Sequence, residues 1–288
     1  MDEKNILLEK MLSKVGDLGF KRRIIKLLEY LNIKEGDTVL DCGCGEGFYT
    51  MIISELYDVQ ITAFDVSAEL LERAASWVKN KKRIKFINGD ITNGLPFDDN
   101  TFDKIVFSEV LEHLERDYDV LKEIYRVAKP DGIVGLTVPN ENYPFLWDPL
   151  NWMREHLGFG HFNPKNTILG GVWSYDHKRL YLSNKIKKLA EETGFKVLRI
   201  EASTHYCFPF NYHILRLGKL LYTKFAVPLK VKESMEKFEW RRENGNDNDN
   251  RFGLVRAIFN IFKWIDSQND KYHDVDKSSV SISLKLEK

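Results

Sequence analysis

The stretch that decides the fold is VLDCGCGEGFYT, residues 39–50. Its apolar start predicts the end of a buried strand, and its last residues begin a predicted helix, residues 48–57. Between them, Gly43, Gly45 and Gly47 predict a tight turn. A strand, a glycine turn and a helix N-terminus form the ligand-binding corner of a doubly wound sheet. Glycine suits this turn because a Cβ would block the close approach of a ligand to the backbone.

The glycine spacing separates two classes of ligand. Dinucleotide sites use Gly-x-Gly-x-x-Gly, whereas this chain has Asp41-x-Gly43-x-Gly45-x-Gly47. This pattern resembles the first motif of class I S-adenosylmethionine-dependent methyltransferases, whose ligand has no pyrophosphate to hold. The resemblance implies S-adenosylmethionine as the cofactor.

Alternating strand and helix patterns continue along the chain. Strands are predicted at residues 59–65, 84–88, 102–108, 133–138, 195–202 and 279–286, and helices at 5–15, 20–31, 68–79, 117–128 and 183–193. Ser67 and Ser183 are predicted N-caps, and residues 130–132 (Pro-Asp-Gly) a turn. This order predicts an α/β fold with a doubly wound, mostly parallel seven-stranded sheet. The resemblance implies that the last strand is antiparallel beside the sixth.

The domain plan has five parts. The resemblance implies that residues 1–35 are N-terminal helices that cover the cofactor side, with plain packing as the alternative, and residues 36–202 are the predicted cofactor-binding core. Within the core, residues 139–176 are too long for an ordinary connection, and their aromatic content predicts a substrate lid. Residues 203–276 are a helical insertion, and residues 277–288 hold the last strand. The insertion contains two apolar helical pieces, 213–226 and 253–266, and a polar segment, 243–250.

Composition limits the class of protein. The 288 residues carry 43 basic and 43 acidic side chains, which argues against a dedicated nucleic-acid binder. The three cysteines, Cys42, Cys44 and Cys207, form no disulfide framework or zinc pattern, and we expect reduced thiols. The sequence predicts neither a signal peptide nor an apolar run of about 18 residues. We therefore expect a cytoplasmic protein.

Acids at strand ends are the candidate cofactor ligands. Asp65 ends the second strand, where an acid can accept both ribose hydroxyls of a nucleoside. The resemblance places Asp90 beside the adenine amino group and Ile91 against the adenine face, and a turn role is the alternative for Asp90. The full predicted cofactor-binding set is Asp41, Gly43, Cys44, Gly45, Gly47, Asp65, Val66, Asp90, Ile91, Ser108 and Glu109.

The motifs around the fourth strand narrow the family. Residues 95–103 (LPFDDNTFD) and 108–114 (SEVLEHL) resemble the ubiquinone-biosynthesis type of small-molecule methyltransferase. The resemblance covers residues 36–202. Enzymes that methylate amino groups of nucleic-acid bases often carry Asn/Asp-Pro-Pro-Phe/Tyr after this strand. Residues 108–111 (SEVL) stand there instead, which argues against base N-methylation.

Two carboxylates and two histidines are candidates for the chemistry. Glu109, Glu112 and His113 are predicted to share one face of a helix after the fourth strand, and His177 follows the aromatic connection. The set resembles the metal site of small-RNA 2′-O-methyltransferases, and it would suit magnesium or another divalent ion. The alternatives are a metal-free general base, His113 or His177, with Glu112 beside it, or packed polar residues.

The predicted function is methyl transfer to a hydroxyl of a small or lipid-like molecule, with a carbon as the second choice. The two alternatives are a metal-dependent RNA 2′-O-methyltransferase and a non-catalytic S-adenosylmethionine-binding protein. Five of the six tryptophans lie in the two late insertions: Trp147, Trp152, Trp173, Trp240 and Trp264. The apolar helical stripes of these insertions predict packing in the core or at a dimer interface, which is the preferred interpretation. The other hypothesis is peripheral contact with a membrane.

Overall fold

In the computed structural model the chain forms two compact units. The sheet unit comprises Arg23–Glu141, Lys178–Glu201 and Ser281–Lys288, and the helical unit comprises Met1–Arg22, Asn142–His177 and Ala202–Val280. The structure describes residues 3–13, 15, 17–78, 81–162, 168–173, 177–207, 209–210, 213, 253–272 and 274–288.

The sheet unit is built on one seven-stranded sheet with the order β3-β2-β1-β4-β5-β7-β6. The strands are β1 (Thr38–Cys42), β2 (Gln60–Asp65), β3 (Ile84–Asn88), β4 (Phe102–Ser108), β5 (Ala128–Pro139), β6 (Lys196–Ser203) and β7 (Ser281–Glu287). The pairs β1–β2, β2–β3, β1–β4 and β4–β5 are parallel, and β5–β7 is antiparallel. The predicted fold class is confirmed.

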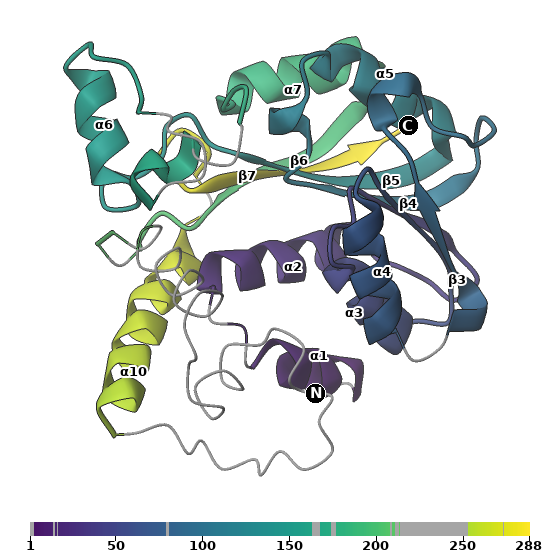
Figure 1. The fold of residues 1–288 in the computed structure, drawn as a ribbon, viewed down its shortest axis with the longest axis horizontal. Coiled ribbons are helices and arrows are strands. Elements are labelled where there is room, and N and C mark those ends of the chain that lie inside the picture. The colour runs from purple at the N-terminus through teal and green to yellow at the C-terminus, as the bar shows by residue number, and fades with distance from the viewer. Residues whose placement is uncertain are drawn as a thin grey trace. The chain divides into compact units, whose positions relative to one another are not determined.

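Helices cover both faces of this sheet. They are α2 (Leu18–Leu31), α3 (Phe48–Leu56), α4 (Ala68–Trp77), α5 (Asp117–Val127) and α7 (Ser183–Glu192). Figure 1 shows α5 and α7 on one face and α3 and α4 on the other. Short 3₁₀ turns, η1 (Lys81–Arg83), η2 (Ile91–Asn93) and η3 (Leu111–His113), lie between them. The strand order reverses between β1 and β4, and ligands bind at the carboxyl ends of strands beside such a switch point.

The core of the sheet unit explains why these patterns fold as they do. Ile105 and Phe107 of β4 are fully buried, as are Leu121 and Ile124 of α5. The α5 residues recur at helical spacing and therefore face the sheet together. On the other side, α2 packs close to β5. A Cβ added at Gly135 would lie only 2.8 Å from the side chain of Leu27.

Most elements begin and end within three residues of the prediction, but β5 begins at residue 128 and not at 133, and two of the predicted end signals differ. The Ser67 cap is confirmed, since its side chain accepts the amide N–H of Leu70, but α7 has Leu182 as its N-cap and Ser183 already lies inside the helix. The predicted turn at residues 130–132 lies within β5. The β4–β5 register there jumps from Phe102–Ala128 to Lys104–Ile133, so extra residues of β5 bulge out of the ladder.

The helical unit contains α1 (Glu3–Leu12), α6 (Pro149–His156), η4 (Ile168–Trp173), α10 (Gly253–Ser267) and η6 (Gln268–Lys271). The predicted helix at 253–266 is confirmed by α10. Apart from His213, the predicted helix 213–226 and the polar segment 243–250 lie outside the described residues. In the part of the chain that the structure describes, no helix is long and apolar enough to cross a membrane.

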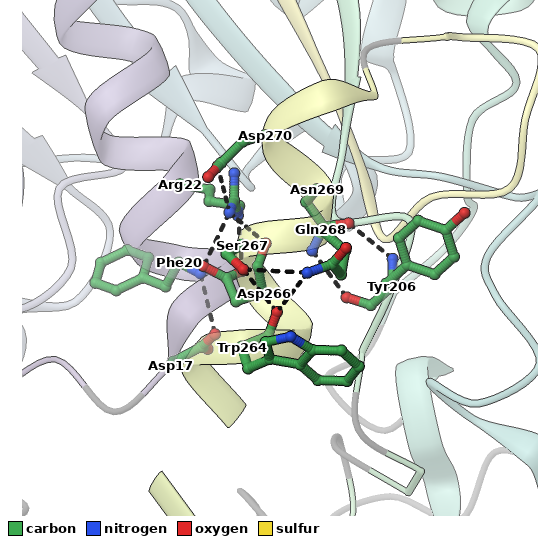
Figure 2. A network of polar contacts seen from close by, with 10 residues as sticks. All are labelled: Asp17, Phe20, Arg22, Tyr206, Trp264, Asp266, Ser267, Gln268, Asn269 and Asp270. Atoms are coloured by element: carbon green, nitrogen blue, oxygen red, sulfur yellow. Dashed lines mark hydrogen bonds and ion pairs between the residues drawn. The ribbon is translucent and has the colours of Figure 1, made fainter. Parts of the chain in front are cut away.

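Polar contacts hold α10 to the start of α2 (Figure 2). Arg22 Nε lies 2.7 Å from Asp266 Oδ1, and Arg22 Nη2 lies 2.7 Å from Asp270 Oδ1. Asn269 pairs with the backbone of Tyr206: its Oδ1 accepts the amide N–H at 2.8 Å, and its Nδ2 donates to the carbonyl at 2.9 Å. Asn269 is 2% exposed, so these two bonds satisfy a buried amide.

Candidate functional site

The glycine turn after β1 has a crowded side and an open side. Gly43, Gly45 and Gly47 all have positive φ, at 76°, 53° and 75°. A Cβ on Gly43 would lie 2.3 Å from Val110, and one on Gly47 would lie 2.6 Å from Ala74. A Cβ on Gly45 would meet no atom within 4 Å. The turn is therefore packed against protein at its ends and opens onto free space at its middle residue.

Asp41 holds the start of the glycine turn to helix α3. Its carboxylate is 1% exposed and accepts hydrogen bonds from Thr50 of α3, at 2.9 Å from the amide nitrogen and 2.6 Å from Oγ1. Burial raises the pKa of Asp41 to about 6, although both bonds from Thr50 lower it. The carboxylate therefore links the end of β1 to the first turn of α3, the two elements that the glycine turn connects.

Asp65 at the end of β2 lies against the same turn. Its Oδ2 accepts the amide N–H of Gly45 at 2.7 Å, and its Oδ1 accepts that of Ser67 at 2.9 Å. The side chain of Asn88 donates to the carbonyls of Asp65 and Val66. Val66 is 69% exposed. The predicted ribose acid thus lies beside the open glycine, next to an exposed apolar side chain.

The end of β3 combines a small residue, an acid and a buried aliphatic side chain. A Cβ on Gly89 would lie 2.8 Å from the ring of Phe64. Asp90 is exposed and caps η2, since its Oδ1 accepts the amide N–H and the hydroxyl of Thr92. Ile91 is buried. The alternative turn role of Asp90 is thus present in this structure, and its second carboxylate oxygen remains available to a ligand.

The cysteines of the loop are packing residues in this structure. Cys42 and Cys44 are buried free thiols, as is Cys207. Burial, with the nearby charges of Asp41 and Asp65, raises the pKa of Cys44. A thiol with a raised pKa is a poor nucleophile, so Cys44 can contribute shape to the loop and not reactivity.

A hydrogen-bonded chain runs along the carboxyl ends of β4 and β5. Arg23 Nη1 of α2 lies 2.6 Å from Glu109 Oε2, and Thr137 donates to Glu109 Oε1 at 3.0 Å. Ser108 Oγ lies 2.8 Å from Thr137 Oγ1 and 3.3 Å from the hydroxyl of Tyr49. Burial raises the pKa of Tyr49, so its hydroxyl keeps its proton. This chain connects α2, α3, β4 and β5 beside the glycine turn.

The predicted helix carrying Glu109, Glu112 and His113 on one face is wrong. Only η3, Leu111–His113, follows β4, and Glu109 has φ 55°, which interrupts a right-handed helix. Glu109 precedes η3, and its carboxylate contacts Arg23 and Thr137.

Glu112 and His113 lie together on η3. Glu112 is fully buried, and His113 Nε2 lies 3.9 Å from Glu112 Oε1. Burial, followed by the charge of Glu109, raises the pKa of Glu112 well above its ordinary value. The carbonyl of Glu112 accepts the amide N–H of Lys178 at 2.8 Å. His177 precedes Lys178 in the chain and belongs to the helical unit, while Tyr175 and Asp176 lie outside the described residues.

Sequence reasoning missed the partners that position the predicted residues. These are Arg23, Tyr49, Thr50, Asn88 and Thr137. Tyr49 and Thr50 carried a local signal, because both lie in the first turn of the helix after the glycine loop. The others come from separate elements, and no spacing connects them to their partners.

Comparison with known proteins agrees with this geometry. A family model described as a methyltransferase domain matches residues 40–136. The demethylmenaquinone methyltransferase of Staphylococcus haemolyticus is 31% identical, over 62% of this chain and 76% of that protein. The one from Staphylococcus epidermidis is 34% identical, over 38% and 45%. The sterol 24-C-methyltransferase of Pneumocystis carinii is 36% identical, over 41% and 33%. The chain thus spans less than half the length of the last two relatives.

The chain belongs to the class I S-adenosylmethionine-dependent methyltransferases. The solved structure of the [4+2]-cyclase SpnF has the same fold, with a TM-score of 0.54 at 18% identity, over 93% of this chain and 80% of that one. Because that protein is named for a cyclisation, the fold alone does not define the reaction. The site must do so.

Proposed function

We propose that this protein transfers the methyl group of S-adenosylmethionine to a small lipid-like molecule of the quinone or sterol kind. One observation carries the proposal: Gly45 faces open space while its amide N–H is held by the carboxylate of Asp65. This is the local shape that a nucleoside needs, with backbone within reach and an acid for ribose hydroxyls. The names of the demethylmenaquinone and sterol relatives support the substrate class.

The residues of the corner would divide the binding between them. Asp65 would accept hydrogen bonds from the ribose hydroxyls, and Asp90 would accept one from the adenine amino group. Exposed Val66 and buried Ile91 would contact the adenine faces. The bound cofactor supplies an electrophilic methyl group. The chain Arg23–Glu109–Thr137 holds α2 against the carboxyl ends of β4 and β5, and alignment of this kind is the main contribution a protein makes to in-line displacement.

The acceptor atom is proposed to be a hydroxyl oxygen, with a carbon as the second candidate. His113 lies beside Glu112 on η3 and is 36% exposed, so it can receive a proton from an acceptor hydroxyl. The name of the sterol relative specifies a carbon, which favours the second candidate. Isotopic labelling of the methyl group followed by NMR of the product would distinguish an O-methyl from a C-methyl group.

Binding of a divalent ion by residues that include those after β4 is a more detailed proposal. The carboxylate of Glu112 and the imidazole of His113, both in the sheet unit, are the side chains that would hold it, since oxygen and nitrogen donors suit such ions. His177 is the further ligand that the sequence predicts. Glu109 is a weaker candidate ligand than the sequence predicted, because its carboxylate already pairs with Arg23. Activity and melting temperature measured with magnesium, manganese and a chelator would test this proposal, and no response in either would contradict it.

The deciding experiment measures cofactor binding and transfer together. We expect calorimetry to detect S-adenosylmethionine and S-adenosylhomocysteine, and Asp65→Asn to weaken both about tenfold to hundredfold, because it removes a charged acceptor. Asp98→Asn, an exposed acid outside the corner, is the control. Transfer of labelled methyl to a lipid extract supports the proposal. Transfer to RNA, or binding without transfer to either, would replace it with one of the two alternatives.

A further inference from the structure

Helix α6 of the helical unit turns its apolar residues outward. Leu150, Met153 and Leu157 follow the i, i+3, i+7 spacing of one helix face, and they are 42%, 50% and 65% exposed. Phe159, three residues past the end of the helix, is 69% exposed. An amphipathic helix of a folded protein ordinarily packs such a stripe against its core. In α6 the stripe is an outer face.

The inner face of α6 is polar and well bonded. Asp148 and Asn151 are fully buried, and Asn151 Nδ2 donates to Asp148 Oδ2 at 2.7 Å. Glu155 accepts the hydroxyl of Tyr143 and the indole N–H of Trp173, both at 2.8 Å. Because unpaired buried polar groups are costly, these bonds fix which side of α6 faces the protein. These polar bonds therefore also determine that the apolar stripe points outward.

We propose that the outer face of α6, defined as Leu150, Met153, Leu157 and Phe159, docks on the surface of an anionic lipid bilayer. A helix that lies in a membrane interface presents one apolar face to the acyl boundary and keeps its polar groups on the other side. More exposed apolar residues flank the outer face on either side in sequence: Phe145, Leu146 and Phe162. Exposed apolar side chains thus recur through residues 145–162, and large exposed apolar patches mark interaction sites.

The charges around the outer face select the anionic surface. Arg154 contacts the carbonyl oxygen of Phe159 and the ring of Phe162, neither of which neutralises its charge. Glu155 is the only acid within α6, and its carboxylate accepts the Tyr143 hydroxyl and the Trp173 indole N–H, with His161 Nδ1 4.0 Å away. His156 is exposed at the end of the helix. The face thus combines apolar side chains with a cation, which complements anionic headgroups.

The inference rests on the proposed function and deepens it by naming where the substrate is collected. Quinone- and sterol-like molecules partition into bilayers because of their apolar bodies. An enzyme that methylates them gains access by resting on the membrane. Vesicle binding needs neither cofactor nor turnover, so the docking face and the methyl transfer can fail independently.

The test compares the wild-type protein with three variants in vesicle flotation. We expect binding to phosphatidylcholine vesicles that contain phosphatidylglycerol, and weaker binding to phosphatidylcholine alone. Leu150→Asp/Met153→Asp/Leu157→Asp should lower the partition coefficient at least about tenfold, equivalent to about 1.4 kcal/mol. Arg154→Gln should lower binding to the anionic vesicles about fivefold and leave binding to neutral vesicles unchanged. Tyr118→Asp, an exposed position on α5, is the control and should bind as the wild type does.

Three outcomes would overturn the proposal. The first is no vesicle binding by the wild type while calorimetry still detects S-adenosylmethionine. The second is a triple variant that binds as tightly as the wild type with an unchanged melting temperature. The third is a wild-type oligomer in size-exclusion chromatography that the triple variant converts to a monomer, which would make the outer face of α6 a contact between copies of this chain.

Discussion

Helices α5 and α6 are both amphipathic, yet they face their own units in opposite ways. The sheet-unit helix α5 buries Val120, Leu121, Ile124 and Val127. The helical-unit helix α6 exposes Leu150, Met153 and Leu157 and buries Asn151. Apolar spacing therefore defines a stripe without deciding where the stripe points. In α5 the apolar stripe packs against the apolar sheet, whereas in α6 the polar side packs against buried polar groups.

Truncation of a side chain on each helix should give the largest contrast. Ile124→Ala in α5 should lower the free energy of unfolding by about 2–5 kcal/mol, because it opens a cavity in the core. Met153→Ala in α6 should change it by no more than about 0.5 kcal/mol, because the side chain is half exposed. Urea denaturation of both variants measures the difference. Equal losses would mean that the α6 stripe is packed in solution.

The glycine turn should be nearly as sensitive as the core. Gly43→Ala places a Cβ 2.3 Å from Val110 at a φ of 76° and should cost about 2–4 kcal/mol from strain and overpacking. Gly158→Ala after α6 is the matched control, because its φ is 79° but its Cβ meets nothing within 4 Å. We expect a smaller loss there, of about 1–2 kcal/mol. Similar melting temperatures for the two variants would show that contact with Val110 does not constrain the turn.

The buried carboxyl of Asp41 should make stability depend on pH in the acid range. Its folded pKa of about 6 lies above the ordinary value of 3.8, so the folded state binds the proton more tightly than the unfolded state. This contribution is fully present below about pH 4 and is lost as pH rises through about 6, with a size on the order of 3 kcal/mol. Asp41→Asn should not show it. We would measure the difference in unfolding free energy between the two proteins from pH 4 to pH 7, and a constant difference would contradict the prediction.

The smallest effect is expected at the contact between α10 and α2 (Figure 2). Arg22→Gln removes the ion pairs with Asp266 and Asp270 and should cost about 1 kcal/mol, because these side chains remain partly solvated. Lys26→Gln, which breaks the Glu201 pair of the sheet unit, is the matched variant. Amide exchange in α10 should rise for the first variant only. Unchanged exchange would show that Asn269 and Tyr206 suffice to hold the helix.

Much of the fold, and the placement of some candidate site residues, followed from local patterns. Strands β3 and β4 have the predicted bounds, since alternating apolar runs and turn residues are short-range signals. The placement of Asp65 beside the glycine turn likewise follows from parallel strands ending at one edge. The pairing of Arg23 with Glu109 had no such signal, because α2 and the end of β4 meet only after the chain has folded. The positive φ of Glu109 was equally hidden, and it turned an expected helix into a short 3₁₀ turn.

By itself the sequence determined the order of strands and helices, the glycine corner and the acids at the strand tips, because each depends on residues that are near neighbours in the chain. Only the tertiary structure decided which partner each polar group has. Glu109 turns to Arg23, and α6 turns its polar side inward to Tyr143 and Trp173. The physical reason is that a buried polar group must find its partner wherever the fold supplies one.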